Sequence, residues 1–238
     1  MEASGYGRGH RFLEIASIGI FLAGMACLTL RAARAVQDSM DLLWLALAAL
    51  GGYLFADFLS GVTHWAGDTL GDERTPVFGP NFVRPFREHH TDQKGITRHD
   101  FIETNGNNCI VSLPVVLLLV FEMPKTVGLW FYLSAVMAFC TWFVFCTNQF
   151  HKWAHADQAP AFVRRLQRWG LILSPEHHAI HHAAPHDKYY CITVGWMDPV
   201  LFRLGFFRGC EAIVARVSPG FLHLGERQGA ERPLIAPR

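Results

Sequence analysis

Four long apolar runs alternate with polar segments along the chain. The runs cover residues 12–30, 42–63, 109–121 and 126–147. A membrane-spanning helix needs about 20 apolar residues, which the first, second and fourth runs supply. The third run is shorter, but the tight connection at residues 122–125 pairs it with the fourth, so we expect a helical hairpin that extends into residues 106–109. The pattern predicts an all-α membrane protein with four transmembrane helices.

The polar segments predict a cap on one side of these helices. With four spans, the N-terminus, the loop of residues 64–108 and the segment 151–238 share one face of the membrane. The arginine-rich loops of that face make it cytoplasmic by the positive-inside rule. Two amphipathic segments, at 162–169 and 202–207, either lie in the membrane interface or pack on the bundle. We therefore expect a histidine-rich cytoplasmic cap of short and amphipathic helices.

The spans and the cap predict one integral-membrane domain. It comprises residues 1–238, with its core at about residues 12–215 and flexible tails at 1–11 and 226–238. Inside the domain, the segment Asn105-Gly106-Asn107-Asn108 is typical of a turn that caps the third span.

Composition argues against several classes of protein. Only 17% of the residues are charged, below the roughly 25% of soluble domains. The net charge of +1 gives no basic surplus for nucleic-acid binding. The six cysteines are scattered without a CxxC pair, which indicates buried free thiols rather than a disulfide framework or a zinc knuckle. Asp57 lies inside the second apolar run, where an ionisable residue serves either pairing within the bundle or function.

Histidine is the outlier of the composition, with 13 residues. Four of them lie in the stretch Ser174-Pro175-Glu176-His177-His178-Ala179-Ile180-His181-His182. Ser174 is typical of a helix N-cap, and Pro175 of a first helical residue. At 100° per residue, the four imidazoles would fall within an arc of about 140° on one helix face. Because neutral imidazole is the commonest metal ligand, this face predicts a metal site.

Other histidines are expected on the same side of the membrane. His64 and His151 lie where the second and fourth spans reach the cap, and each has a partner four residues on, Asp68 and His155, which shares its helix face. The predicted metal ligands are His64, His89, His90, His151, His155, His177, His178, His181 and His182, with His99, His186 and Asp68 as further candidates. His10 and His223 lie near the termini and are expected to be outside the site.

This many imidazoles implies two metal ions, because one ion takes at most about six ligands. The chain has no cluster of acids or cysteines at the spacing of a calcium, magnesium or structural zinc site, and imidazole suits zinc, copper or iron. Two reaction classes fit: oxygen activation by two irons, and zinc-dependent hydrolysis of a membrane lipid. Hydrolytic zinc uses about three protein ligands per ion, so the ligand count favours iron. A haem or metal carrier is the non-enzymatic alternative, although a bis-histidine haem would leave most of the set idle.

Several strings in these segments carry a family resemblance. His151-x-x-x-His155 and His178-x-x-His181-His182 resemble the histidine boxes of membrane fatty-acid desaturases and hydroxylases. The fuller strings closely resemble the plasmanylethanolamine desaturases, the lipid desaturase family once called Kua, over about residues 50–215. These strings are Phe86–His90 (FREHH), Thr97–Gly106 (TRHDFIETNG), Thr147–His155 (TNQFHKWAH), His177–His186 (HHAIHHAAPH) and Cys191–Trp196 (CITVGW).

The resemblance implies an O2-dependent enzyme that removes two hydrogens from the 1-O-alkyl chain of an ether phospholipid and forms the vinyl ether of a plasmalogen. It implies two iron ions on the predicted histidines, O2 as co-substrate, and electrons from an external donor that is cytochrome b5-like or ferredoxin-like. A sister branch of the family desaturates an acyl chain of phosphatidylglycerol, so the head group stays open. We expect a multi-pass protein of a bacterial inner membrane, or of the endoplasmic reticulum in a eukaryote, with its active site on the cytoplasmic face.

Overall fold

Helices form most of the described chain. The computed structural model describes residues 7–223, and no β-strand occurs among them. Four helices are long and apolar enough to cross a membrane, namely α1 (Arg8–Ala35), α2 (Ser39–Thr69), α5 (Phe101–Glu122) and α6 (Leu129–His155). The prediction of an all-α membrane protein with four spans is therefore confirmed.

Each span is longer than its apolar run, because polar residues continue the helix toward the cap. Helix α2 runs on through His64 to Thr69, and α6 runs on through His151 to His155. At the other end of the chain, α1 already begins at Arg8, so the prediction of a flexible tail is wrong for residues 8–11. The tail segments 1–6 and 226–238 lie outside the described residues.

The start of α5 corrects the turn that was predicted at residues 105–108. The helix begins at Phe101 because the side chain of Asp100 accepts hydrogen bonds from the backbone N–H groups of Ile102 and Glu103. The amide side chains that suggested a turn bind α6 instead. Asn105 Nδ2 donates to Gln149 Oε1 at 3.3 Å, and Asn108 Nδ2 donates to the Val144 carbonyl at 2.8 Å. These bonds give the amide N–H groups acceptors, without which their burial would be costly.

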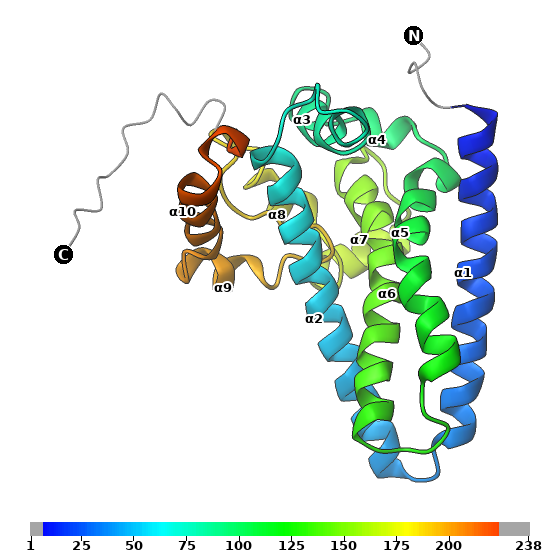
Figure 1. Cartoon of the computed structure of the whole chain (residues 1–238). Helices are drawn as coiled ribbons and strands as arrows, with labels where there is room; N and C mark the ends of the chain where they lie inside the picture. The colour runs from blue at the N-terminus through cyan, green and yellow to red at the C-terminus, as the bar shows by residue number, and fades with distance from the viewer. Residues whose placement is uncertain (1–6, 224–238) are drawn as a thin grey trace.

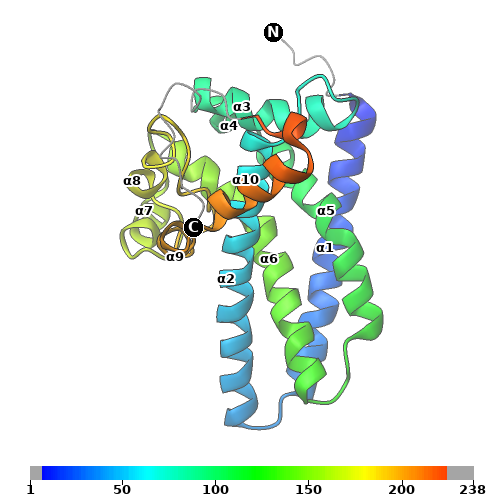
Figure 2. The same cartoon turned by 60° about the vertical axis from the view of Figure 1, so that its left-hand side comes forward.

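The spans pack in the order α2, α6, α5, α1 (Figure 1). Short loops join α1 to α2 and α5 to α6 at the end remote from the cap, and the spans diverge toward the cap (Figures 1 and 2). The apolar core at the loop end comprises Leu28, Ala35, Ala48, Leu119, Met123, Phe131, Ala135 and Ala138. This packing holds the remote ends together and leaves room for the cap between the divergent ends.

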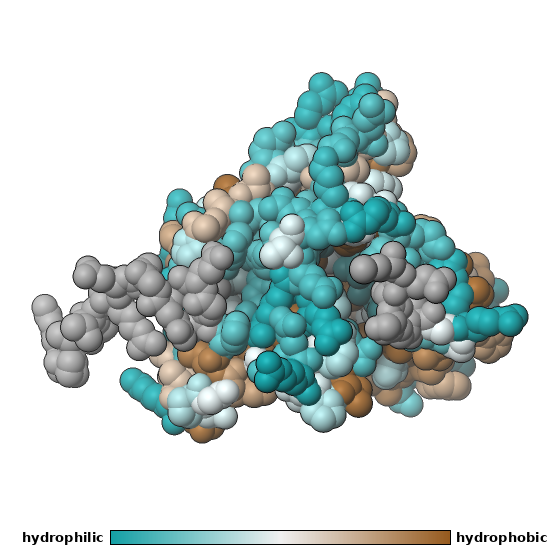
Figure 3. All heavy atoms as spheres, turned by 90° about the horizontal axis from the view of Figure 1, so that it is seen from above, coloured by the Kyte–Doolittle hydropathy of each residue, from teal (hydrophilic) through white to brown (hydrophobic). Residues whose placement is uncertain are grey.

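The cap consists of short helices that cover the divergent ends of the spans. They are η1 (Gly79–Val83, a π-helix), α3 (Arg84–Thr91), α4 (Gly95–Arg98), α7 (Ala161–Arg168), α8 (Pro175–Ala179), α9 (Asp198–Arg203), α10 (Phe206–Val217) and η2 (Pro219–Phe221). Seen from the cap side, the surface is largely hydrophilic, with apolar side chains toward the rim (Figure 3). A polar cap above apolar spans is the arrangement expected of a protein that meets water on this side.

The two amphipathic segments pack differently. The second one packs on the bundle, because Phe207 is buried against Trp65 and Tyr190. In the first one, Val163 is buried, while Phe162 and Trp169 are exposed. Burial of apolar side chains from α10 therefore fixes the C-terminal part of the cap against α2.

Candidate metal centre

Four elements deliver the histidines of the centre. Helix α2 provides His64 and Asp68, and α6 provides His151 and His155, each pair four residues apart on one helix face. Helix α3 provides His89 and His90, whereas α8 and the turn after it provide His178, His181 and His182. These side chains form two groups that could each hold a metal ion. Segments that are distant in the sequence thus meet between the spans and the cap.

The first group contains five imidazoles, those of His89, His151, His155, His178 and His182. Their Nε2 atoms converge. The distances are 2.9 Å for His89–His155 and for His151–His178, 3.0 Å for His178–His182 and 3.2 Å for His151–His155. Two nitrogens that each bind one ion at about 2.1 Å and at right angles lie about 3.0 Å apart. The spacing is therefore that of ligands around one ion.

The rings of the first group have a defined arrangement. The His155 ring lies 4.5 to 4.9 Å from each of the other four rings. The rings of His89 and His178 instead face each other across the group, with centroids 6.2 Å apart. The five imidazoles thus take five corners of an octahedron, with His155 at the apex. The sixth corner, opposite His155, carries no ligand from this group.

The second group comprises the side chains of His64, Asp68, His90 and His181. Asp68 lies among the three imidazoles. Its Oδ1 is 3.0 Å from His90 Nε2, and its Oδ2 is 3.4 Å from His181 Nε2 and 3.6 Å from His64 Nε2. Because His181 Nδ1 donates to the Lys188 carbonyl at 3.0 Å, its Nε2 keeps a lone pair for the second group. Asp68, which the sequence offers only as a further candidate beside His99 and His186, thus lies where it could share an ion with the three imidazoles.

The second group lies on the side of the first that is opposite His155. Rings of the second group approach those of His89, His151, His178 and His182 to between 5.3 and 6.4 Å. Within residues 7–223, no such ring contact involves His155. The sixth corner of the first group consequently points toward the second group, so that a small molecule could contact both sites.

Buried polar atoms test whether these residues fit metal ions. Both ring nitrogens of His64, Nε2 of His181 and Oδ2 of Asp68 are buried without a hydrogen-bond partner. An unsatisfied buried polar atom costs about 1–3 kcal/mol. An ion at the second group would satisfy the carboxylate and the imidazole lone pairs at once. The donor set of neutral nitrogens and one carboxylate fits zinc, copper or iron.

Burial keeps the cap histidines of the first group neutral. It lowers the pKa of His89 to about 3, and the neighbouring His155 adds to this shift. Burial also lowers the pKa of His178 and of His182. Metal ions bind the unprotonated imidazole, so these side chains are in the ligand form at neutral pH without loss of a proton.

The stretch 174–182 does not present one continuous imidazole face. Ser174 caps α8 as predicted, since its side chain accepts a hydrogen bond from the His177 N–H. However, α8 ends at Ala179, and the following turn is tighter: the His181 N–H donates to the His178 carbonyl, three residues back. The tighter turn sends His181 to the second group, whereas His178 belongs to the first.

His177 lies outside both groups, contrary to its prediction as a ligand. Its Nε2 donates to Asp198 Oδ2 at 2.8 Å. Gly195, with φ of +82°, packs so closely on the imidazole that an added Cβ would lie 2.2 Å from His177 Nε2. A glycine is thus required here both for the left-handed backbone and for the close approach. His177 joins α8 to the loop before α9.

The other candidate histidines also lie outside the two groups. His99 is exposed, with Nε2 3.6 Å from Glu103 Oε1. His186 packs beside the centre: its ring lies 4.4 Å from that of His90, and its Nδ1 donates to the His181 carbonyl. His10 lies beside Glu14, and the backbone of His223 binds Thr69. The structure therefore brings eight of the predicted histidines together with Asp68.

Two buried acids hold the segment of residues 191–197 through hydrogen bonds to its backbone. Asp57 on α2 accepts hydrogen bonds from the backbone N–H groups of Val194 and Gly195 on Oδ1 and of Met197 on Oδ2. Asp198 accepts from the Cys191 N–H and from His177. Asp57 thus has a structural role, in which it binds the loop before α9 to α2. The supporting role of Asp198 was missed, although an acid directly before Pro199 is a signal for a helix start.

Comparison with known proteins decides the family. The lipid desaturase domain matches residues 53–219. The chain belongs to the lipid desaturase family. It is 46% identical over 230 residues to the plasmanylethanolamine desaturase of Myxococcus xanthus, with 96% of this chain and 80% of that protein covered. It is 42% identical to plasmanylethanolamine desaturase 1 of Mus musculus over 220 residues, with 88% and 79% covered. The resemblance seen in the histidine strings is confirmed.

Other desaturases are more distant. The lipid desaturase described here is 36% identical to the chloroplastic fatty acid desaturase 4 of Arabidopsis thaliana over 170 residues, which covers 71% of this chain and 51% of that protein. No solved structure matches the chain. The family and these relatives make the enzyme an oxidoreductase that acts on a membrane lipid.

Proposed function

We propose that this lipid desaturase introduces the vinyl ether double bond into the 1-O-alkyl chain of an ether phospholipid, with two irons held by the two histidine groups. The first group would hold one ion through five imidazoles, and the second group would hold the other through three imidazoles and Asp68. When bound, the irons would supply the activation of O2 that is needed to remove hydrogen from an unactivated C–H bond. Plasmanylethanolamine is the substrate class in the names of two relatives.

One observation carries the choice of metal chemistry: nine donors converge in two adjacent groups, and the open corner of the first points toward the second. Hydrolytic zinc sites use about three protein ligands and a carboxylate that acts as acid or base. The only carboxylate among the nine donors, Asp68, lies within the second group itself. The ligand set is therefore better suited to a redox pair of ions than to zinc hydrolysis.

The chain's own residues would position the lipid and exclude water. The reacting carbon of a 1-O-alkyl lipid is next to the glycerol, so the reaction must take place near the head-group layer. The histidine groups lie at the cap ends of α2 and α6, which is this level. His64, His151, His178 and His181 are buried, and the packing around them limits the access of bulk water to the reacting groups.

The position of the histidine groups at the cap ends of the spans also bears on membrane orientation and electron supply. The cap carries the arginine-rich segments, and by the positive-inside rule it would face the cytoplasm. His89, His155 and His182 are only half-buried, so the first group can be approached from the cap surface. An external donor of cytochrome b5-like or ferredoxin-like type would deliver electrons on this side, in a bacterial inner membrane or in the endoplasmic reticulum.

A second candidate has a specific observation in its favour. The chloroplastic fatty acid desaturase 4 shares the family over most of this chain, and an acyl-chain desaturase of phosphatidylglycerol would need the same histidine groups. The two functions differ in head group and chain, not in the metal centre. Lipid products therefore separate them.

Metal analysis of the purified protein tests the proposed chemistry. We expect about two irons per chain, no Soret absorption and loss of activity without O2. Zinc in place of iron, together with activity that survives under anaerobic conditions, would overturn the proposal. A Soret band would instead support a haem carrier.

A further inference from the structure

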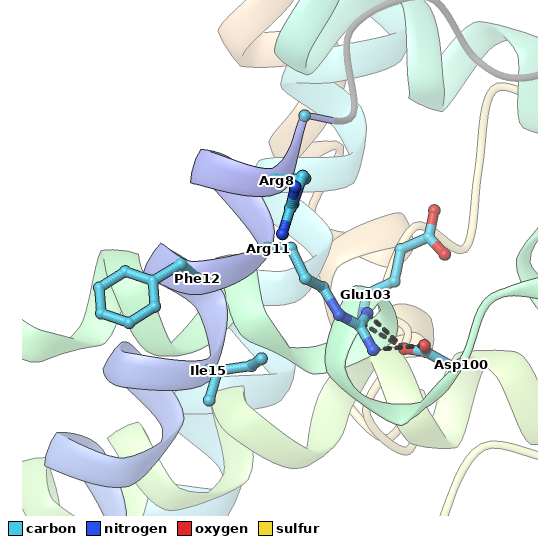
Figure 4. A pocket seen from close by; sticks show the side chains of 7 residues that line it. Arg8, Arg11, Phe12, Ile15, Asp100 and Glu103 are labelled. Carbon is cyan, nitrogen blue, oxygen red and sulfur yellow. Dashed lines mark hydrogen bonds and ion pairs between the residues drawn. The ribbon is translucent and has the colours of Figure 1, made fainter.

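A hollow opens at the cap end of α1, between this helix and the start of α5 (Figure 4). It is lined by Gly7, Arg8, Arg11, Phe12, Ile15, Asp100 and Glu103. None of these residues belongs to the two histidine groups. The hollow combines two basic and two acidic side chains with apolar ones, and it lies where a membrane span meets the cap.

Only some of the charged side chains that line the hollow form ion pairs with one another. Arg11 and Asp100 form a forked ion pair, with N–O distances of 2.8 and 2.6 Å. Arg8 forms no ion pair within residues 7–223. Glu103 has a loose contact with His99 at 3.6 Å. One guanidinium on α1 and one carboxylate on α5 therefore remain available to a ligand that carries both signs of charge.

An apolar stripe continues from the hollow down α1. Residues spaced as i, i+4, i+7, i+11 and i+14 share one helix face, and here they are Arg8, Phe12, Ile15, Gly19 and Leu22. Phe12, Ile15 and Leu22 are 73%, 48% and 44% exposed. A side chain at Gly19 would meet no atom within 4 Å. The stripe is thus an exposed apolar surface with a dent at Gly19.

The length of this surface matches one leaflet. At 1.5 Å per residue, the rise from the first to the last of these positions is about 21 Å. Half of the hydrocarbon core of a bilayer is about 15 Å thick, and the head groups lie above it. The charged end is therefore at head-group height, and the apolar part extends along one hydrocarbon leaflet.

We propose that the hollow and the stripe bind one phospholipid whose head group carries both a phosphate and an ammonium, such as phosphatidylethanolamine. Arg8 donates to the phosphate, and Glu103 accepts from the ammonium. One hydrocarbon chain lies along Phe12 and Ile15 and fills the dent at Gly19. An anionic head group without an ammonium fits less well, because the carboxylates of Glu103 and Asp100 would repel it. The site is separate from the reaction at the histidine groups.

Native mass spectrometry of the full chain in detergent tests this site directly. With added phosphatidylethanolamine, we expect the wild type to bind one lipid per chain. Arg8→Ala should weaken this binding about tenfold or more, as expected for a lost charged hydrogen bond. Gly19→Leu should do the same by filling the dent, and it should fold well because it enters open space and favours the helix. The matched control is Arg34→Ala, an exposed arginine at the other end of α1, which should bind like the wild type.

Other ligands identify what the site recognises. Phosphatidylglycerol should bind the wild type more weakly than phosphatidylethanolamine does, and Glu103→Gln should reduce this difference. Inorganic phosphate should not displace the lipid. The proposal is overturned if the wild type binds no lipid, if all variants bind equally, or if phosphatidylglycerol or inorganic phosphate competes on equal terms. Lipid occupancy is measured without turnover. Absence of lipid binding at this site would therefore leave the proposed desaturase function intact, and absence of desaturase activity would leave this lipid site intact.

Discussion

The Nε2 atoms of His151 and His178 lie 2.9 Å apart, although the two residues are 27 positions apart in the chain. His151 comes from a membrane span, and His178 comes from a five-residue helix in the cap. This contact joins the two parts of the protein at the first histidine group. The geometry of the group thus depends on the packing of the cap on the spans.

The neighbours His177 and His178 should behave differently when each is replaced. His178→Ala removes a ligand of the first group, so we expect loss of metal from that group and loss of activity. His177→Ala should retain both ions, because this side chain binds Asp198 rather than a metal. It should nevertheless lower stability by about 1–3 kcal/mol, since a buried carboxylate oxygen loses its partner. Metal content and thermal unfolding of the two variants check both expectations. Loss of metal in His177→Ala as severe as in His178→Ala would contradict the assignment.

Asp57 should be required for stability rather than for metal binding. Asp57→Ala leaves three backbone N–H groups of the loop without an acceptor, at a cost of about 3 kcal/mol or more. Asp57→Asn keeps one oxygen, so its effect should be intermediate. Denaturant unfolding in detergent should give a free energy of unfolding that decreases from the wild type to Asp57→Asn and again to Asp57→Ala. An alanine variant as stable as the wild type would mean that the loop is held by other contacts.

Two adjacent glycines of α2 offer a matched test of its packing on α6. A Cβ at Gly52 would lie 2.6 Å from the Val136 carbonyl oxygen and 2.7 Å from the Cys140 nitrogen, both of which are backbone atoms. A Cβ at Gly51 would make only ordinary contacts at 3.8 Å. Gly52→Ala should therefore destabilise the protein by about 1–3 kcal/mol. Gly51→Ala should be neutral or stabilising by up to about 1 kcal/mol, because alanine favours the helix. Equal melting temperatures for the two variants would contradict this packing.

The ion pair between Arg11 and Asp100 predicts a pH dependence. The Arg11 guanidinium holds the pKa of the Asp100 carboxyl well below its usual value, and the backbone N–H of Glu103 adds to the shift. A carboxyl with a lowered folded-state pKa stabilises the fold above its unfolded pKa of about 3.9, and this contribution is lost as pH falls toward the folded value. Asp100→Asn, which can still cap α5, should be less stable than the wild type by a constant amount from about pH 7 to 5. The difference should shrink below about pH 4, as measured by thermal unfolding. A difference that does not change with pH would argue against the ion pair.

The spans, and most of the residues that form the two histidine groups, could be predicted from the sequence because both depend on local patterns. Apolar runs are long enough to identify the spans, and histidines spaced by four residues share a helix face whatever the rest of the fold does. The limits of the spans could not be predicted, because the cap residue Asp100 starts α5 at Phe101, eight residues before the apolar run that begins at residue 109. Bonds from Asn105 and Asn108 to α6 also depend on tertiary contacts that no local pattern contains.

The division of the histidines into groups lay beyond the sequence for a similar reason. A regular helix through residues 174–182 would place four imidazoles on one face, but the tight turn after Ala179 sends His181 and His182 to different groups. The role of His177 depends on Gly195, in the loop before α9, and on Asp198, the first residue of α9. Hydrogen bonds from that segment to Asp57 and Ser60 on α2 hold these positions.

Lipid analysis of cells that express the protein, with a 1-O-alkyl phospholipid supplied in the presence of O2, tests the central claim most directly. The account predicts an acid-labile vinyl ether product in the wild type and none with His181→Ala, which removes a ligand of the second group. His10→Ala serves as the matched histidine control and should retain the product. The absence of any vinyl ether from the wild type, when the protein carries its irons and a competent electron donor is present, would contradict the account.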